Sequence, residues 1–263
     1  MMLGPLLTAV ELVIAFAEHV VVEVSHVTHL FFARIKSCNT FYGDGLRVVV
    51  YGDEVWSLLR RLRERALMVM SHLKQHGFDS IVYGSVARGD VSPSSDLDIF
   101  IPFPVPMYKL EYALSLLQPI HKRELVQATP YYAPKAYLYL NEKDTVSAPM
   151  VPLNRDEEGF YKLAGYLTLE ELRRDVRKPG INKALQLIIP TAEGHVEKPL
   201  KHSFEEAVKT LDISPDILNS RMKVLLKRRE KGHTGVYQHI VLHEGMSFEE
   251  AFEKMMQKSR RKH

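Results

Sequence analysis

Cysteine is almost absent from the sequence: Cys38 is the single cysteine among 263 residues. One cysteine excludes an intrachain disulfide and a thiolate metal cluster, because each needs at least two thiols. A chain without disulfides fits a reducing compartment, and we therefore predict a cytoplasmic location.

The sequence also lacks an uncharged apolar run long enough to cross a membrane. The stretch from Leu3 to Ile35 is apolar, but Glu11, Glu18 and Glu23 interrupt it, and a span needs on the order of 20 apolar residues. No basic residue precedes the run, which disfavours a signal peptide. We expect no membrane partner. Residues 1–50 show neither helical nor strand periodicity, and we assign them as an N-terminal extension of unknown role.

A strong excess of one charge is missing as well, since the formal net charge is only +3. Hydrophobic and charged fractions of 46% and 25% are ordinary for a globular protein and name no function. Basic residues nevertheless gather near the C-terminus, in KVLLKRREK from Lys223 and in the final KSRRKH. This pattern fits either a surface that binds a polyanion or a solvated helix face followed by a tail.

The spacing of apolar residues from position 53 onward predicts alternating helices and strands. A long amphipathic helix is expected at 53–76, with Gly77 as its C-cap, and Lys178-Pro-Gly180 should stop a later helix. The other expected elements are strands at 80–83, 97–101, 124–128, 136–140, 145–151 and 185–189, and helices at 107–118, 155–164 and 168–177.

The pentapeptide SFEEA occurs twice, beginning at Ser203 and at Ser247. A serine followed three residues later by glutamate is typical of a capping box, in which each side chain binds a backbone N–H of the first helical turn. The neighbouring sequence does not repeat, so we predict two helix starts rather than a solenoid.

The segment from Tyr83 to Phe100, YGSVARGDVSPSSDLDIF, carries the residues best suited to chemistry. Asp96 and Asp98 are two residues apart on an expected strand, so both side chains lie on one face and can share divalent cations. Gly84 and Ser85 follow another expected strand and open a short helix, whose free N–H groups can hold phosphate oxygens. Each pair alone is a weak signal, but the complete string is specific.

This string resembles the signature of nucleotidyltransferases of the DNA polymerase beta superfamily. The layout of residues 125–152 is similar to that of the catalytic domain of archaeal CCA-adding enzymes, and the resemblance covers about residues 54–160. It implies a nucleotidyltransferase fold of the α+β (mixed α/β) class, with a small mixed sheet flanked by helices, in a domain over residues 51–160.

The resemblance also implies roles for the site residues. Gly84 and Ser85 would bind the phosphates of an NTP such as ATP, while Asp96 and Asp98 would be catalytic and would bind Mg²⁺ or Mn²⁺. Arg88 would assist with phosphate binding, unless it forms an ordinary pair with Asp90.

The sequence departs from the family pattern at a third metal-binding carboxylate. The family places this acid on a neighbouring strand, and the comparable stretch from Val146 to Pro152 contains no acid. Glu124, Glu142 and Asp144 are the nearest candidates in the sequence.

The C-terminal part, residues 201–263, resembles a helix-turn-helix or winged-helix domain, and residues 161–200 form a linker region with helices and one strand. Ser214-Pro215 starts its second helix, Leu218, Met222 and Leu225 form the buried stripe, and Gly232 to Leu242 could be a wing. The residues expected to face DNA or RNA are Asn219, Arg221, Lys223 and Lys227. A plain helical cap on the catalytic domain is the alternative.

Two functions follow from these patterns. The first is an Mg²⁺-dependent enzyme that transfers a nucleoside monophosphate from an NTP to an acceptor hydroxyl by two-metal chemistry. The second is a catalytically degenerate protein that binds NTP and regulates through nucleic-acid binding. The intact Gly-Ser and Asp-x-Asp pairs favour the first, and the missing third acid favours the second.

Overall fold

The computed structural model describes residues 39–41, 45–232 and 235–260. The chain divides into two units, 1–38 and 39–263, and everything described below belongs to the second unit. The predicted N-terminal extension therefore lies largely outside the described residues.

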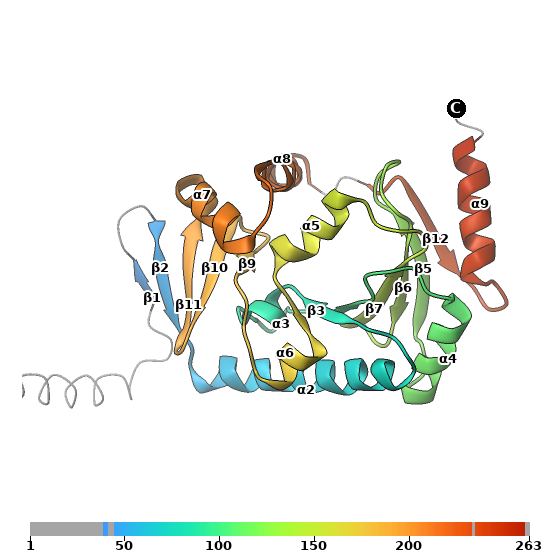
Figure 1. Cartoon of the computed structure of the whole chain (residues 1–263), viewed down its shortest axis with the longest axis horizontal. Helices are drawn as coiled ribbons and strands as arrows, with labels where there is room; N and C mark the ends of the chain where they lie inside the picture. The colour runs from blue at the N-terminus through green and yellow to red at the C-terminus, as the bar shows by residue number, and fades with distance from the viewer. Residues whose placement is uncertain (1–38, 42–44, 233–234, 261–263) are drawn as a thin grey trace, which may run out of the picture. The chain divides into compact units, whose positions relative to one another are not determined.

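A seven-stranded mixed sheet forms the centre of this unit (Figure 1). Strands β4 and β7 are parallel, and all other neighbouring strands of this sheet pair in antiparallel fashion. In spatial order the strands are β12 (Gln238–Leu242), β5 (Lys122–Gln127), β6 (Lys135–Tyr139), β7 (Asp144–Pro149), β4 (Leu97–Phe100), β3 (Ile81–Tyr83) and β8 (Tyr166–Thr168).

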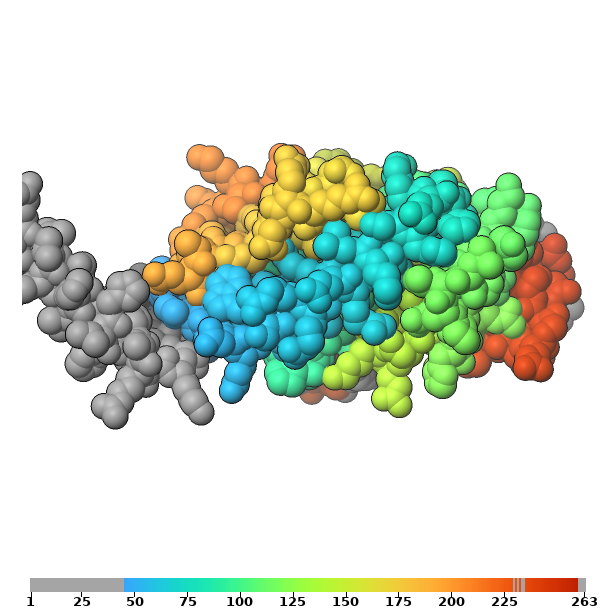
Figure 2. Space-filling view, turned by 90° about the horizontal axis from the view of Figure 1, so that it is seen from below, coloured from blue at the N-terminus to red at the C-terminus, as the bar shows by residue number. Residues whose placement is uncertain are grey.

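Helices cover one face of this sheet and form the larger core with it. The long helix α2 (Asp53–Gln75) packs beside α4 (Met107–Leu117) and α6 (Leu169–Arg173), and Figure 2 shows the surface that these helices make. Helix α9 (Phe248–Arg260) contacts α4 and β5. Leu97 and Ile99 of β4 point into this core, because alternate residues of a strand share a face.

The opposite face of the sheet carries Asp98 and Phe100 and is partly covered by α5 (Arg155–Ala164) (Figure 1). The Tyr161 ring of α5 stacks on the Phe100 ring, with centroids 4.0 Å apart. Asn154 caps α5 through a reciprocal capping box with Glu157, which fixes where this helix begins.

A second, antiparallel sheet lies beside the first and was not expected as a unit. Its strands, in spatial order, are β1 (Asn39–Phe41), β2 (Arg47–Val50), β11 (Gly194–Pro199), β10 (Gln186–Thr191) and β9 (Gly180–Ile181). Helices α7 (Leu200–Leu211) and α8 (Pro215–Lys231) pack against it through a separate core.

The structure confirms the predicted α+β class with a mixed sheet, and most of the expected elements. Helix α2 and the strands at the signature lie within one residue of their predicted ends. The expected helix at 168–177 is shorter, because 166–168 form strand β8 and α6 ends at Arg173. The predicted linker over 161–200 contains most of the second sheet.

The predicted basic domain over residues 201–263 differs most from the structure. Leu218 and Leu225 are buried as expected, but α7 and α8 pack on the second sheet. Strand β12, expected as a wing, pairs with β5 of the first sheet. The segment is therefore shared between both sheets and is not one helix-turn-helix unit.

The two SFEEA segments also differ. At Ser247 the capping box is present, since Ser247 Oγ accepts from Glu250 N–H and Glu250 accepts from Ser247 N–H, both at 3.1 Å. At Ser203 the prediction of a capping box is wrong. Ser203 lies inside α7 at a kink, and its hydroxyl donates to the Pro199 carbonyl at 2.9 Å.

Candidate active site

The Gly84–Ser85 turn joins β3 to α3 (Ser85–Arg88). Gly84 has φ +82°, which favours glycine because a side chain is strained there. Its N–H donates to the Gly165 carbonyl at 2.9 Å, and the Ser85 hydroxyl donates to Ser95 Oγ at 3.2 Å. The turn therefore directs the start of α3 toward the loop that precedes Asp96, which contains Ser92, Ser94 and Ser95 and is called the serine loop below.

Buried arginines hold this turn in place. Arg63 of α2 donates to the Val86 and Ala87 carbonyls, both at 3.2 Å. Arg88 binds both carboxylate oxygens of Asp90, at 2.9 and 3.0 Å, and the Ala164 carbonyl at 2.6 Å. Arg88 is only 5% exposed and its donors are used within the protein, so the geometry favours the Asp90 pair over phosphate binding.

The two predicted metal ligands lie at the start of β4. Asp96 is exposed, and Asp98 is half-buried on the sheet face that carries α5. Burial of the carboxyl group and the charge of Asp96 raise the pKa of Asp98 to about 6, while Lys183 opposes this effect. Neither carboxylate forms an ion pair with another described residue. A divalent cation would relieve the repulsion between these two hard oxygen donors, so the pair fits Mg²⁺ or Mn²⁺.

None of the three candidates for a third acid lies with this pair. Asp144 pairs in register with Leu97, so its side chain lies on the α2 face, where it binds Arg65 and Asn141. Glu124 is three strands away and accepts from the Tyr139 hydroxyl at 2.8 Å.

Glu142, the remaining candidate, is an exposed residue of the turn before β7. No group of three or more His, Cys, Asp or Glu side chains in the described part of the chain could hold a metal ion.

Tyrosines occupy the sheet positions around Asp98 instead. Tyr83 pairs with Asp98 across the sheet, and its ring meets the Tyr161 ring edge-on at 5.0 Å. Burial, and secondarily the charge of Asp98, raises the pKa of Tyr137 to about 12. The same two causes raise the pKa of Tyr83 well above its ordinary value. These phenols therefore stay neutral near pH 7, and their rings give the Asp98 carboxylate a largely apolar surrounding.

A cleft of about 360 Å³ opens above these residues, and we call it the Asp98 cleft. One wall is the Gly84–Ser85 turn, the serine loop and the two aspartates; the other is built by α5, the β9–β10 turn and α8. The second wall contributes the cations Lys183 and Arg221.

Arg221 has a different environment from the other residues expected to face nucleic acid. It was expected to face nucleic acid, but it is half-buried in the Asp98 cleft, with its guanidinium 4.8 Å from the centre of the Phe160 ring. Burial, and then the charge of Arg228, lowers its pKa. Neither Arg221 nor Lys183 forms an ion pair with a carboxylate of the described residues. Sequence reasoning did not find Lys183, because an isolated lysine in a turn carries no pattern.

The other three residues proposed for nucleic-acid binding have a different environment. Asn219, Lys223 and Lys227 are all exposed on α8. They are accessible to a large partner, whereas Arg221 is accessible through the cleft.

The fold and the cleft define an α+β domain in which a pair of carboxylates lies beside a glycine-serine turn. Residues 63–151 match the family model described as the nucleotidyltransferase domain. This part of the chain is therefore similar to a nucleotidyltransferase domain, in agreement with the resemblance seen in the sequence, and the match supports a general role in nucleotidyl transfer. No curated protein matches the chain. The second sheet and α8, with Lys183 and Arg221, lie outside the matched residues.

None of the helices in the described residues combines the length and apolar character that crossing a bilayer needs.

Proposed function

We propose that the protein transfers a nucleoside monophosphate from an NTP to an acceptor hydroxyl in the Asp98 cleft. The observation that carries this proposal is the arrangement of the cleft. Asp96 and Asp98 lie on one wall, with the N-terminus of α3 beside them, and the other wall carries two cations that form no ion pair with a carboxylate of the described residues. This distribution of charge is complementary to a triphosphate with bound divalent metal.

Asp96 and Asp98 would hold the divalent metal, Mg²⁺ or Mn²⁺. Such a metal supplies charge neutralisation at the phosphate oxygens and lowers the pKa of the attacking hydroxyl. Asp98 would be ionised for this role near pH 7, because its pKa of about 6 lies below that pH.

The phosphates would be held from both walls of the cleft. The Ser85 and Val86 N–H groups at the start of α3 and the Ser85 hydroxyl would face the triphosphate from one side, whereas the Ala87 and Arg88 N–H groups already donate to the Gly84 carbonyl. Lys183 and Arg221 would neutralise its charge from the other side. Phe160 holds the Arg221 guanidinium by stacking, which reduces the entropy that binding would cost.

The alternative is a protein that binds NTP without turnover and acts as a regulator. The lack of a third carboxylate beside Asp98 in the described residues favours it. Both functions predict metal-dependent NTP binding, so only product formation separates them.

The acceptor or regulatory target that α8 suits best is a nucleic acid. Helix α8, which carries Arg221 into the cleft, also has exposed polar and basic side chains: Asn219, Lys223, Lys227 and the adjacent Arg228. A polyanion on α8 would therefore lie next to the site of transfer.

The test is incubation with each α-phosphate-labelled NTP, Mg²⁺ or Mn²⁺, and separate RNA, DNA and protein fractions. Label that enters one fraction, and is lost in the Asp96→Asn and Asp98→Asn variants, supports the enzyme. Metal-dependent NTP binding without labelled product in any fraction supports the regulator. Absence of NTP binding contradicts both.

A further inference from the structure

A small cavity lies between the C-terminal end of α2 and the first turns of α4, and we call it the α4 pocket. Its volume is about 250 Å³, and it shares no lining residue with the Asp98 cleft. Sites for drug-sized ligands measure roughly 300–1,000 Å³, so the α4 pocket has room for one flat ring rather than for a complete ligand. The lining residues are His76, Phe78, Tyr108, Lys109 and Tyr112.

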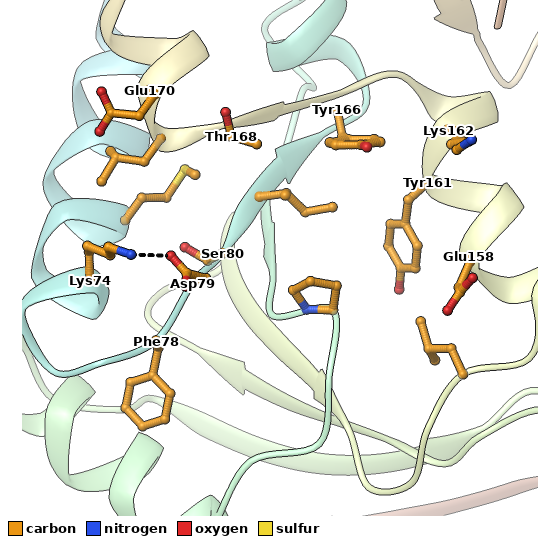
Figure 3. A pocket seen from close by; sticks show the side chains of 15 residues that line it. Lys74, Phe78, Asp79, Ser80, Glu158, Tyr161, Lys162, Tyr166, Thr168 and Glu170 are labelled. Atoms are coloured by element: carbon orange, nitrogen blue, oxygen red, sulfur yellow. Dashed lines mark hydrogen bonds and ion pairs between the residues drawn. The ribbon is translucent and has the colours of Figure 1, made fainter. Parts of the chain in front are cut away.

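Four of these five residues carry aromatic rings. Phe78 is buried, and Figure 3 shows its ring on the side of the green helix α4. Tyr108 and Tyr112 are four residues apart, so their side chains lie on one face of α4, where they are 63% and 64% exposed. Accessible aromatic rings of this kind stack with the bases of single-stranded nucleic acids.

Hydrogen bonds hold the two sides of the α4 pocket together. The His72 ring of α2 donates from Nε2 to the Ala113 carbonyl of α4 at 2.7 Å. The His76 ring donates from Nδ1 to the His72 carbonyl at 2.9 Å, and the two histidine rings lie 4.4 Å apart. The aromatic walls are therefore in place before a ligand arrives, which reduces the entropy that binding would cost.

The charge at the α4 pocket is positive. Lys109 forms no ion pair with a carboxylate of the described residues, and no acidic residue lines the pocket. The acids nearest in sequence are already paired: Glu111 binds Arg123 at 2.7 Å, and Asp79 binds Lys74 at 2.6 Å, as Figure 3 shows. The first turn of α4 contains no acid either, so the positive end of its helix dipole adds to the Lys109 charge. This charge is complementary to a phosphate group.

The exposed apolar surface continues beyond the pocket. Leu116 is 55% exposed one turn after Tyr112, so Tyr108, Tyr112 and Leu116 form a column on successive turns of α4. A free nucleotide in the pocket leaves Leu116 uncovered, whereas the next base of a strand can pack on it. The column therefore suits a strand better than a single nucleotide.

We infer that the α4 pocket and this column bind single-stranded nucleic acid. One unpaired base stacks on the Tyr112 ring in the pocket, its phosphate pairs with Lys109, and the next base packs on Leu116. A duplex does not fit, because its bases are paired and stacked inside the double helix. The α4 pocket lies on the helix-covered face of the sheet, opposite the face that carries Asp98, so the inference does not rest on the proposed function.

The first test measures binding of a short fluorescein-labelled oligouridylate to the full chain by fluorescence anisotropy. A chelator is present, so that metal-dependent binding at Asp98 does not contribute. Tyr112→Ala should weaken binding about tenfold, because the loss of one base stack costs on the order of that factor, and Tyr112→Phe should bind like the wild type. Lys109→Gln should flatten the slope of log affinity against log salt by about 0.7, the contribution of one phosphate on a single strand.

Two controls accompany these variants. Tyr131 is an exposed tyrosine outside the α4 pocket, so Tyr131→Ala should leave the affinity unchanged. Unlabelled UMP should compete about 100-fold less well than the unlabelled oligouridylate, because a single nucleotide makes only one of the linked contacts.

The second test locates the contact. An oligouridylate that contains 5-iodouridine cross-links on irradiation to an aromatic ring stacked on it, and peptide mapping should find the label on Tyr108 or Tyr112. The inference is overturned by a lack of binding, by a cross-link only at other sites, by equal affinities of the Tyr112→Ala and Tyr131→Ala variants, or by competition from UMP as strong as from the oligonucleotide. It is also overturned if Tyr112→Ala dissociates a dimer without changing the oligonucleotide affinity, since the column is then an interface between two copies of the chain.

Discussion

The two walls of the Asp98 cleft differ in charge and in the way the chain supplies them. The wall with Asp96 and Asp98 comes from residues 83–98, and its parts are fixed by hydrogen bonds of the Gly84–Ser85 turn and by the buried Arg63 and Arg88. The opposite wall comes from α5, the β9–β10 turn and α8, and its cations Lys183 and Arg221 have no carboxylate partner among the described residues.

This difference indicates that one wall binds the metal and the other sets the affinity for the triphosphate. A rigid acidic wall can hold a metal at a fixed position, because its ligands are already oriented. Cations on the β9–β10 turn of the second sheet and on α8 can set the affinity for triphosphate without disturbing the metal site. The walls should therefore respond differently to mutation.

The largest effect is expected at the acidic wall. Asp98→Asn should weaken Mg²⁺-dependent NTP binding by about 100-fold or more, because it removes one of two charged ligands from the metal. Asp96→Asn should act in the same direction. Calorimetric titration of NTP with and without Mg²⁺ measures this, and circular dichroism checks folding. Unchanged affinity in both variants contradicts the assignment of the metal site.

A smaller effect is expected at the cationic wall. Arg221→Ala should weaken NTP binding about 10-fold, since it removes a charge-assisted contact, while AMP binding should change less. Lys227→Ala is the matched control, because Lys227 is exposed on the same helix outside the cleft. If the Arg221 and Lys227 variants bind NTP equally well, the second wall does not hold the triphosphate.

The raised pKa of Asp98 predicts a pH effect on the metal-free protein. Folding raises this pKa from an ordinary value near 3.8 to about 6, so the ionised group destabilises the folded state above pH 6. Stability should rise as the pH falls from about 6 to 4, and Asp98→Asn should stabilise the protein by about 2 kcal/mol at pH 7.

Urea unfolding with a chelator present, at pH 4.5 and pH 7, measures this effect. The gain from Asp98→Asn should shrink at pH 4.5, where the wild-type carboxyl group is already protonated. An equal gain at both pH values would mean that the substitution acts through packing rather than through charge.

The smallest effect is expected on the outer surface of α8. Replacing Lys223 and Lys227 by glutamine should weaken RNA or DNA binding and flatten the slope of log affinity against log salt by about 1 to 2 units, because each phosphate contact contributes about 0.9. Asn219→Ala should change sequence preference more than salt slope. Lys254→Gln with Lys258→Gln on α9 is the control pair, and an equal change in both pairs argues against a specific role for α8.

The sequence by itself predicted the acidic wall because its parts are local. Gly84, Ser85, Asp96 and Asp98 lie within 15 residues, and strand alternation alone places both aspartates on one face. The mixed sheet and α2 were also predictable, since their apolar periodicity is clear over several turns or strands.

The tertiary structure alone decided the cationic wall, the second sheet and the place of the C-terminal segment. Strand β2 pairs with β11 about 150 residues later in the chain, and all four residues of β2 are half-buried, so no alternating pattern marks it. Arg221 has the same local pattern as its exposed neighbours on α8. It lies in the cleft because α8 packs beside α5, a contact between segments that are distant in the sequence. Local propensity contains no information about such contacts, so only the folded chain brings Lys183 and Arg221 to Asp98.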